Sequence, residues 1–133
     1  MDDEMENEVK KYDEKKNIIK NKSFLFAIRI VKLHQYLTEK YTKIYSISDQ
    51  VLRSGTSIGA LMSESVHAQS KADFLNKCNV ALKEANETLF WISLLYETKY
   101  INEEEYNSLN KDCEEILKLL ISIVKTMKER LNK

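Results

Sequence analysis

Residues 70–96, which read SKADFLNKCNVALKEANETLFWISLLY, contain the strongest helical pattern of the chain. Apolar side chains recur there at three- and four-residue steps over about six turns, which predicts a long amphipathic helix. At its start, Ser70 and Asp73 resemble a capping box with Asp in the position of the usual Glu. The apolar stripe comprises Phe74, Cys78, Ala81, Leu82, Ala85, Leu89, Ile92 and Tyr96.

Three further segments repeat this period and predict three more helices. The first begins near Ser23, a predicted N-cap, with a stripe of Ala27, Ile30, Val31, His34 and Leu37. The second begins near Ser48 or Asp49, after a connection over 41–48, with a stripe of Val51, Gly55, Ile58, Met62 and Val66. The last follows a turn at 100–101 and an Asn102–Glu105 capping-box pattern, with a stripe of Tyr106, Leu109, Cys113, Ile116, Leu120, Val124, Met127 and Leu131. Short connections between four such helices predict an all-α, antiparallel up-down four-helix bundle over residues 23–133.

The composition supports a helical, globular protein. The chain has 133 residues, no proline and only two glycines, so a turn-rich all-β fold is nearly excluded. Hydrophobic residues make up 43% and charged residues 32%, a mixture typical of a soluble globular domain. The 21 basic and 21 acidic residues give a formal net charge of zero, without the basic excess of strongly electrostatic nucleic-acid binders.

The sequence predicts neither export nor membrane insertion. The N-terminus is charged throughout and lacks the apolar core of a signal peptide, and no apolar run approaches the roughly 20 residues that span a bilayer. Cys78 and Cys113 are far apart and show no metal-binding spacing. We therefore expect a cytoplasmic protein with two buried, reduced thiols and no membrane contact.

The first 22 residues differ from the rest in their blocks of charge. Five acidic residues fall within 1–9, and six lysines against two acidic residues fall within 10–22. Apolar residues are sparse apart from Ile18 and Ile19. We therefore interpret residues 1–22 as a charged, mobile tail or as a loose extension of the helix predicted from Ser23 onward.

Residues 89–96 (LFWISLLY) are apolar on nearly all sides, with Ser93 as the one polar residue. A bundle helix keeps a polar face in water, and four large side chains here cannot all point into a single core. We therefore predict self-association through Phe90, Trp91, Leu94 and Leu95. The alternative is a wide bundle face that the N-terminal tail or the last helix covers.

The stretch 53–60 (RSGTSIGA) is rich in small residues and could be mistaken for a phosphate-binding loop. It lacks the Gly-Lys-Ser/Thr ending of such a loop and follows no predicted strand. Gly55, Gly59 and Ser63 are each one helical turn apart, so they form a smooth groove. We predict that a neighbouring helix packs closely into this groove.

Three charged residues lie beside the predicted core stripes. Arg53 flanks the stripe of the second helix, and Glu84 and Glu87 flank that of residues 70–96. We predict that Arg53 pairs with one of the glutamates where the two helices meet, an interaction that specifies alignment more than it stabilises. A catalytic carboxylate pair is the alternative, but no nucleophile or oxyanion donor accompanies it.

A dinuclear metal site in a bundle needs a Glu-x-x-His pair on each of two helices and a further Glu on each of the others. The chain has one such pair, Glu64 and His67, whereas His34 has Val31 at that spacing instead of an acid. These ligands are too few for a metal site, and two histidines so placed form no catalytic triad. We expect no metal, no cofactor, no small-molecule substrate and no enzymatic activity.

Two basic segments give a weak indication of nucleic-acid binding. Residues 10–22 and 117–133 each carry a local excess of four positive charges, and the candidate contacts are Lys118, Lys125, Lys128 and Arg130. A ring of subunits would repeat either patch into a continuous basic rim. The alternative is a solvated tail together with a helix end whose basic residues complement the helix dipole.

Residues 23–127 resemble the bacterial four-helix-bundle family named for genes found in intervening sequences of 23S ribosomal RNA. The resemblance is carried by RSGTSIGA at 53–60, SKADF at 70–74 and the pattern A-L-K-E-A-x-E-T at 81–88. It implies an antiparallel four-helix bundle that assembles as a homopentamer, with no enzymatic activity and no cofactor. A related branch, the accessory proteins of diversity-generating retroelements, comprises basic pentamers that bind nucleic acid and a reverse transcriptase.

With this resemblance, the sequence predicts a non-enzymatic, homo-oligomeric scaffold or accessory protein. Its expected partners are further copies of itself and RNA or a ribonucleoprotein. The alternative function is a nucleic-acid-binding module that uses basic patches of the assembled oligomer. The apolar surface predicts self-association, whereas the subunit number of five is implied by the resemblance alone.

Overall fold

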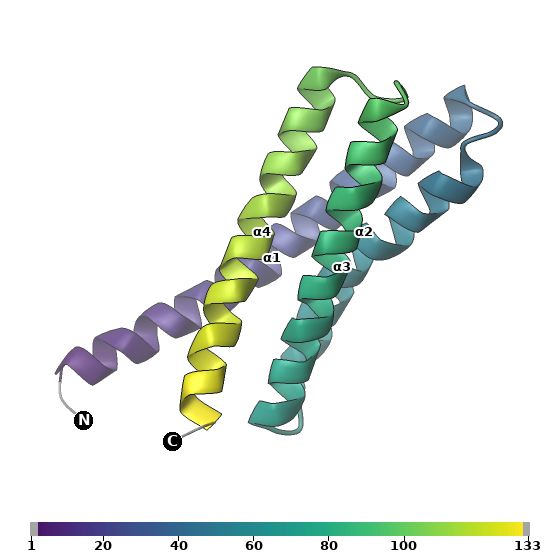
Figure 1. Cartoon of the computed structure of the whole chain (residues 1–133). Helices are drawn as coiled ribbons and strands as arrows, with labels where there is room; N and C mark the ends of the chain where they lie inside the picture. Colours follow the sequence, from purple (N-terminus) through teal and green to yellow (C-terminus); the bar gives the residue numbers. More distant parts are fainter. Residues whose placement is uncertain (1–2, 132–133) are drawn as a thin grey trace.

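The computed structural model describes residues 3–131, which form four α-helices (Figure 1). These are α1 (Asp3–Lys40), α2 (Tyr45–Ser65), α3 (Lys71–Glu97) and α4 (Glu103–Leu131). Each helix packs against the next one in sequence, and α4 packs back against α1, so the bundle closes. The short connections reverse the chain direction at each step. The predicted all-α four-helix bundle is confirmed.

One apolar stripe from each helix builds the core. The largest fully buried side chains include Ile30 and Leu37 of α1, Ile58 of α2, Ile92 and Leu95 of α3, and Leu120 and Ile123 of α4. Three residues that the sequence assigned to core stripes lie outside the core. Val31 is 40% exposed, because Ile30, Leu33 and Leu37 occupy the side of α1 that faces the bundle. Val66 follows the end of α2 and is 59% exposed, and Leu131 is the last residue of α4 and is 42% exposed.

α1 is longer than the sequence pattern predicted. It begins at Asp3, and Ser23, the predicted N-cap, is fully buried in its middle and donates its hydroxyl to the carbonyl of Lys20. Residues 3–22 therefore belong to α1, which agrees with the interpretation of this segment as an extension of the helix, and the predicted helix start at Ser23 is wrong. Tyr12 and Ile19 are buried because they continue the inward stripe of α1 at seven-residue spacing from Phe26.

α1 and α2 approach most closely at the two glycines of α2. A Cβ atom at Gly55 would lie 2.8 Å from Cγ1 and Cγ2 of Ile30, and one at Gly59 would lie 3.0 Å from the backbone oxygen of Ser23. Such short contacts leave no room for a side chain. The helix that enters the predicted groove is therefore α1, whereas Ser63 is exposed.

Two of the predicted helix starts agree with the capping patterns. The hydroxyl of Ser70 accepts from the backbone N–H of Asp73 at 3.0 Å, and Asn102 and Glu105 each accept from the other's backbone N–H. The start of α2 differs, because Ile44 occupies the N-cap position and Ser48 lies inside the helix, fully buried. There Ser48 bonds to Nδ1 of His34, at 2.8 Å, so its hydroxyl serves the α1–α2 contact and not a helix end.

Replacement of Gly55 by alanine is expected to destabilise the bundle. The new methyl group would collide with the branched side chain of Ile30, which is fully buried in the core and would have to shift. Overpacking of this kind costs about 1–3 kcal/mol, which exceeds the gain of about 1 kcal/mol in helix propensity. Thermal unfolding measures the effect. Ser63→Ala, on the exposed side of α2, is the control and should leave the melting temperature unchanged or slightly higher.

Candidate interaction surfaces

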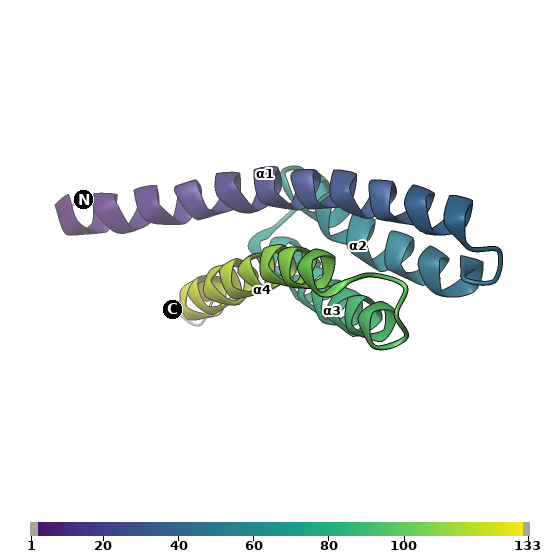
Figure 2. The ribbon, with the colours of Figure 1, turned by 90° about the horizontal axis from the view of Figure 1, so that it is seen from above.

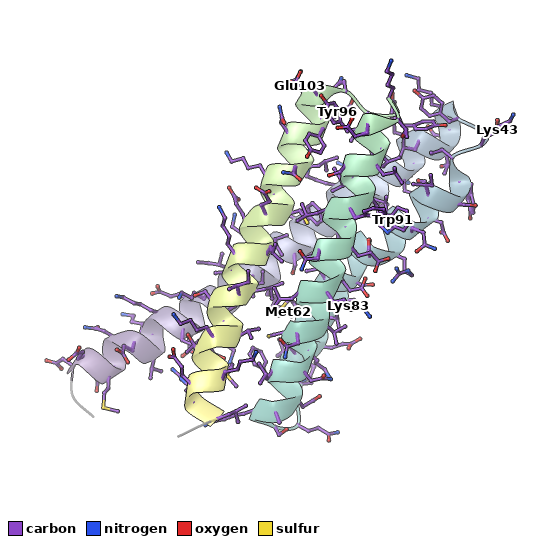
Figure 3. The ribbon with its side chains drawn as sticks, viewed as in Figure 1. Lys43, Met62, Lys83, Trp91, Tyr96 and Glu103 are labelled. Atoms are coloured by element: carbon purple, nitrogen blue, oxygen red, sulfur yellow. The ribbon has the colours of Figure 1, made fainter. Side chains whose placement is uncertain are left out.

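Arg53 is the centre of a polar network on the outside of the α2–α3 contact. Its guanidinium lies 3.4 Å from Oε2 of Glu84 and also contacts Oε1 of Glu87. The same oxygen of Glu87 accepts from Nε1 of Trp91 at 3.2 Å. The structure thus brings Arg53 together with both glutamates, and it adds an aromatic residue that the sequence did not place there. Figure 3 shows Trp91 on the side of α3 that faces α2.

A smaller polar contact lies beneath this network. Ser54 and Thr88 are fully buried, and the hydroxyl of Thr88 bonds to that of Ser54 at 2.9 Å and to the carbonyl of Glu84 at 2.7 Å. A buried hydroxyl pair of this kind is satisfied only when the two helices are in one register. Arg53, Ser54 and their partners on α3 therefore fix how α2 and α3 align.

The four apolar residues of the predicted interface do not share one environment. Phe90 is 58% exposed, Trp91 and Leu94 are half-buried, and Leu95 is fully buried in the core. Leu95 is therefore excluded from any surface of the folded chain, because it points inward with Ile92. Phe90 packs edge-to-face against Trp91, with ring centroids 5.0 Å apart. What remains exposed on α3 is an aromatic pair and not a broad apolar band.

A larger apolar surface lies on α1, where the sequence analysis did not predict one. Phe24 and Leu25 are 65% and 61% exposed, and Ile28 and Val31 complete the face one and two turns on. We refer to these four residues as the α1 face. The sequence FLFAI at 24–28 does not distinguish this face from the core, because Phe26 is buried whereas Phe24, Leu25 and Ile28 are exposed. The signal that could have indicated this face is the width of the apolar stripe on α1, which is greater than the strip that packs in the core.

The two basic segments of the sequence meet in a groove between α1 and α4. Since these helices are antiparallel, residues 11–22 lie beside residues 115–130, and Lys15 donates to the hydroxyl of Ser122 at 2.6 Å. Lys22 pairs with Glu115 at 3.1 Å. A shallow, open depression and a hollow of about 300 Å³ follow this contact. We call it the α1–α4 groove, and its charged lining comprises Lys11, Lys15, Lys22, Lys118 and Arg130 against Glu8, Glu115 and Glu129.

The predicted nucleic-acid contacts fall on two sides of α4. Lys118 lines the groove, and Arg130 lines it with its guanidinium 4.4 Å from the centre of the Tyr12 ring. Lys125 and Lys128 are exposed on the outer surface of α4. The sequence alone could not connect the lysines of α1 with the basic residues of α4, because no local sequence pattern links segments about a hundred residues apart.

Tyr12 is buried where α1 meets the other helices at this end of the bundle. Its ring lies between the ammonium of Lys16, at 5.0 Å, and the guanidinium of Arg130. Burial raises the pKa of Tyr12 to about 12, and its hydroxyl is the one buried side-chain polar atom within residues 3–131 that has no hydrogen-bond partner. Tyr12 therefore anchors α1 through its ring and not through a hydrogen bond.

The opposite end of the bundle is rich in tyrosine. Tyr96 stacks on Tyr106 with centroids 4.5 Å apart, and Tyr41 meets Tyr100 edge-to-face at 4.8 Å. A cavity of about 630 Å³ opens beside them, where the chain passes from Tyr96 to Glu103 (Figure 3). Its lining mixes carboxylates with lysines, so it favours neither an anion nor a cation.

The thiols and histidines have structural environments. Burial raises the pKa of Cys78 to about 11 and that of Cys113 to about 12, so both thiols stay protonated near neutral pH. Glu64 and His67 are both exposed. Within residues 3–131, no three His, Cys, Asp or Glu side chains gather in a way that would hold a metal ion, and no helix is long and apolar enough to cross a membrane.

The comparisons with known proteins place this geometry in a family. A sequence model described as 23S rRNA-intervening sequence protein matches residues 15–122. The chain belongs to this family. A crystal structure of a protein with unknown function from the S23 ribosomal protein family of Bacteroides thetaiotaomicron VPI-5482 is 56% identical, with a TM-score of 0.80. The match covers 84% of this chain and 98% of that chain, and no curated protein matches significantly.

The limits of the family match divide the surfaces described above. The Arg53 network, the α1 face and the aromatic pair on α3 all lie within residues 15–122. Residues 3–14, which include Tyr12, and the basic end of α4 lie outside it. The α1–α4 groove is therefore built partly from the family's matched core and partly from the two ends of this chain.

Arg53→Met is expected to lower the melting temperature. The substitution leaves Glu84 and Glu87, whose side chains are only 13% and 27% exposed, without their cationic partner. We expect a loss of about 1 kcal/mol of unfolding free energy, measured by chemical denaturation, since half of the arginine is in water. Lys22→Met is the control, because it breaks a more exposed pair with Glu115 and should cost less. Equal losses for both would contradict an aligning role for Arg53.

Proposed function

We propose that the protein is a non-enzymatic, homo-oligomeric scaffold or accessory factor that acts in the cytoplasm. The observation that carries this proposal is the α1 face, on which Phe24 and Leu25 remain more than half exposed in the single chain. A contiguous apolar surface of this kind marks an interaction site. The catalytic alternative has little support, because the carboxylates near the core bind Arg53 and both thiols are protonated.

The position of a second apolar site favours association between copies of the chain. Phe90 lies on α3, which does not pack against α1 (Figure 2). Each molecule thus has two different apolar surfaces on helices that are not neighbours. When unlike surfaces join head to tail, the contacts close into a ring if the rotation permits. Such a ring agrees with the homopentamer that the family resemblance implies, and the number five rests on that resemblance.

Replacement of the α1 face tests this assembly. Light scattering coupled to size exclusion should give a multimer near five times 15.6 kDa for the wild type, and a monomer for Phe24→Ser/Leu25→Ser. Because neither side chain belongs to the core, the two substitutions themselves should change the melting temperature of the single folded subunit little. Val66→Ser replaces a comparably exposed residue elsewhere and should leave the mass unchanged. A monomeric wild type would refute the proposal.

RNA binding in the α1–α4 groove is the second candidate function. It is favoured because the fold places lysines from α1 beside those of α4, and a ring would repeat this positive strip in every subunit. Phosphate groups are the expected ligands, since lysine ammonium groups bind them without base specificity. This function would need neither a catalytic residue nor a cofactor.

The salt dependence of RNA affinity tests whether lysines of the groove contact phosphate groups. If Lys11, Lys15 and Lys118, which line the groove, contact phosphates, their joint replacement by glutamine should weaken binding of a single-stranded RNA and flatten its salt dependence. The slope of log affinity against log salt should fall by about 2, measured by fluorescence anisotropy. A triple variant that removes three lysines elsewhere, Lys32, Lys43 and Lys83, is the control. Identical slopes for the two variants would exclude the groove.

A further inference from the structure

The first turns of α1 form a helical arm that extends beyond the rest of the bundle. Residues 3–9 are all exposed, and Figures 1 and 2 both show the start of α1 leading away from the other helices. Only Met5 and Val9 among these residues are apolar, and a largely polar helix needs internal ion pairs or a partner to be stable. None of the ion pairs seen within residues 3–131 joins two side chains of the arm.

The arm and the α1–α4 groove are complementary in charge. The arm, DEMENEV, carries Asp3, Glu4, Glu6 and Glu8 and no basic residue. The groove is lined by five basic against three acidic side chains, and Lys11 and Lys118 make no ion pair seen in residues 3–131. An apolar strip lies between these charges, where Ile18 is 44% exposed beside Leu119. A short acidic helix with an apolar residue such as Val9 matches this lining.

Apart from Glu8, which lines the near end of the groove, the arm cannot reach the groove of its own chain. α1 is one continuous helix from Asp3 to Lys40, and the groove uses residues 8–22 of the same helix as a wall. The arm therefore leads away from that wall, and a return would require α1 to break. We propose that the arm of one copy docks in the α1–α4 groove of another. This inference rests on the proposed self-association and names a contact in which the arm lies outside the residues matched by the family and the groove lies partly inside them.

Charge reversal on each side, followed by mixing, tests this contact. The arm variant is Glu4→Lys/Glu6→Lys, and the groove variant is Lys11→Glu/Lys118→Glu. Each alone should repel its own kind and raise the concentration at which the multimer dissociates by about tenfold, measured by light scattering over a dilution series. In an equimolar mixture the positive arm meets the negative groove wherever the two variants alternate, so the dissociation concentration should fall back towards that of the wild type.

Glu103→Lys/Glu104→Lys is the matched control. It reverses the same number of charges in the first turn of another helix, so it reproduces the loss of favourable helix-dipole interaction without touching the arm. Circular dichroism of every variant verifies that the bundle remains folded. The control should dissociate at the wild-type concentration.

The possible outcomes are distinct. If the wild type assembles, and the arm and groove variants dissociate at the same concentration as the wild type, the arm contact is wrong and self-association stands. Weakened assembly without rescue in the mixture also overturns the arm contact, because the two sites then do not meet. A monomeric wild type overturns self-association and the arm contact together. Weakening on both sides with rescue on mixing is the result that supports it.

Discussion

The close approach of α1 to the glycines of α2 is the contact on which the arrangement of this bundle depends. With no side chain at Gly55 and Gly59, Ile30 and the backbone at Ser23 lie directly against α2. This contact holds the middle of the 38-residue helix α1 and leaves its two ends to reach different partners. One end carries the tyrosines beside the α3–α4 turn, and the other carries Tyr12 and the lysines beside α4.

α1 is therefore both a core element and the source of most of the exposed large apolar side chains. Its inner stripe is buried from Tyr12 to Leu37, whereas Phe24, Leu25 and Ile28 face outward from the same turns. A helix that is apolar on two sides can bury one within its own chain, and the other then stays exposed on the single subunit. The Arg53 network has a complementary role, because it fixes the register of α2 and α3 and holds Trp91 beside Phe90.

Much of the fold could be predicted because helix formation is governed by contacts within one or two turns. The four helices, the cap at Ser70 and the reciprocal cap at Asn102 and Glu105 all follow from neighbours three or four residues apart. The start of α1 could not be predicted in this way. Its inward stripe passes through Lys16 between Tyr12 and Ile19, and that lysine is accommodated by cation–π contacts that only a tertiary neighbour such as Phe74 completes.

The candidate surfaces were predicted less well than the helices. Arg53 and its glutamates were identified because each flanks a core stripe, but Leu95 was misplaced and the α1 face was missed. Helical periodicity shows which residues share a side, and it does not show how wide a strip the neighbouring helices cover. The sequence by itself therefore determined the helices, their order and the small residues that permit close packing. Only the tertiary structure decided which apolar residues stay exposed and which distant lysines meet, because both depend on how the helices cross.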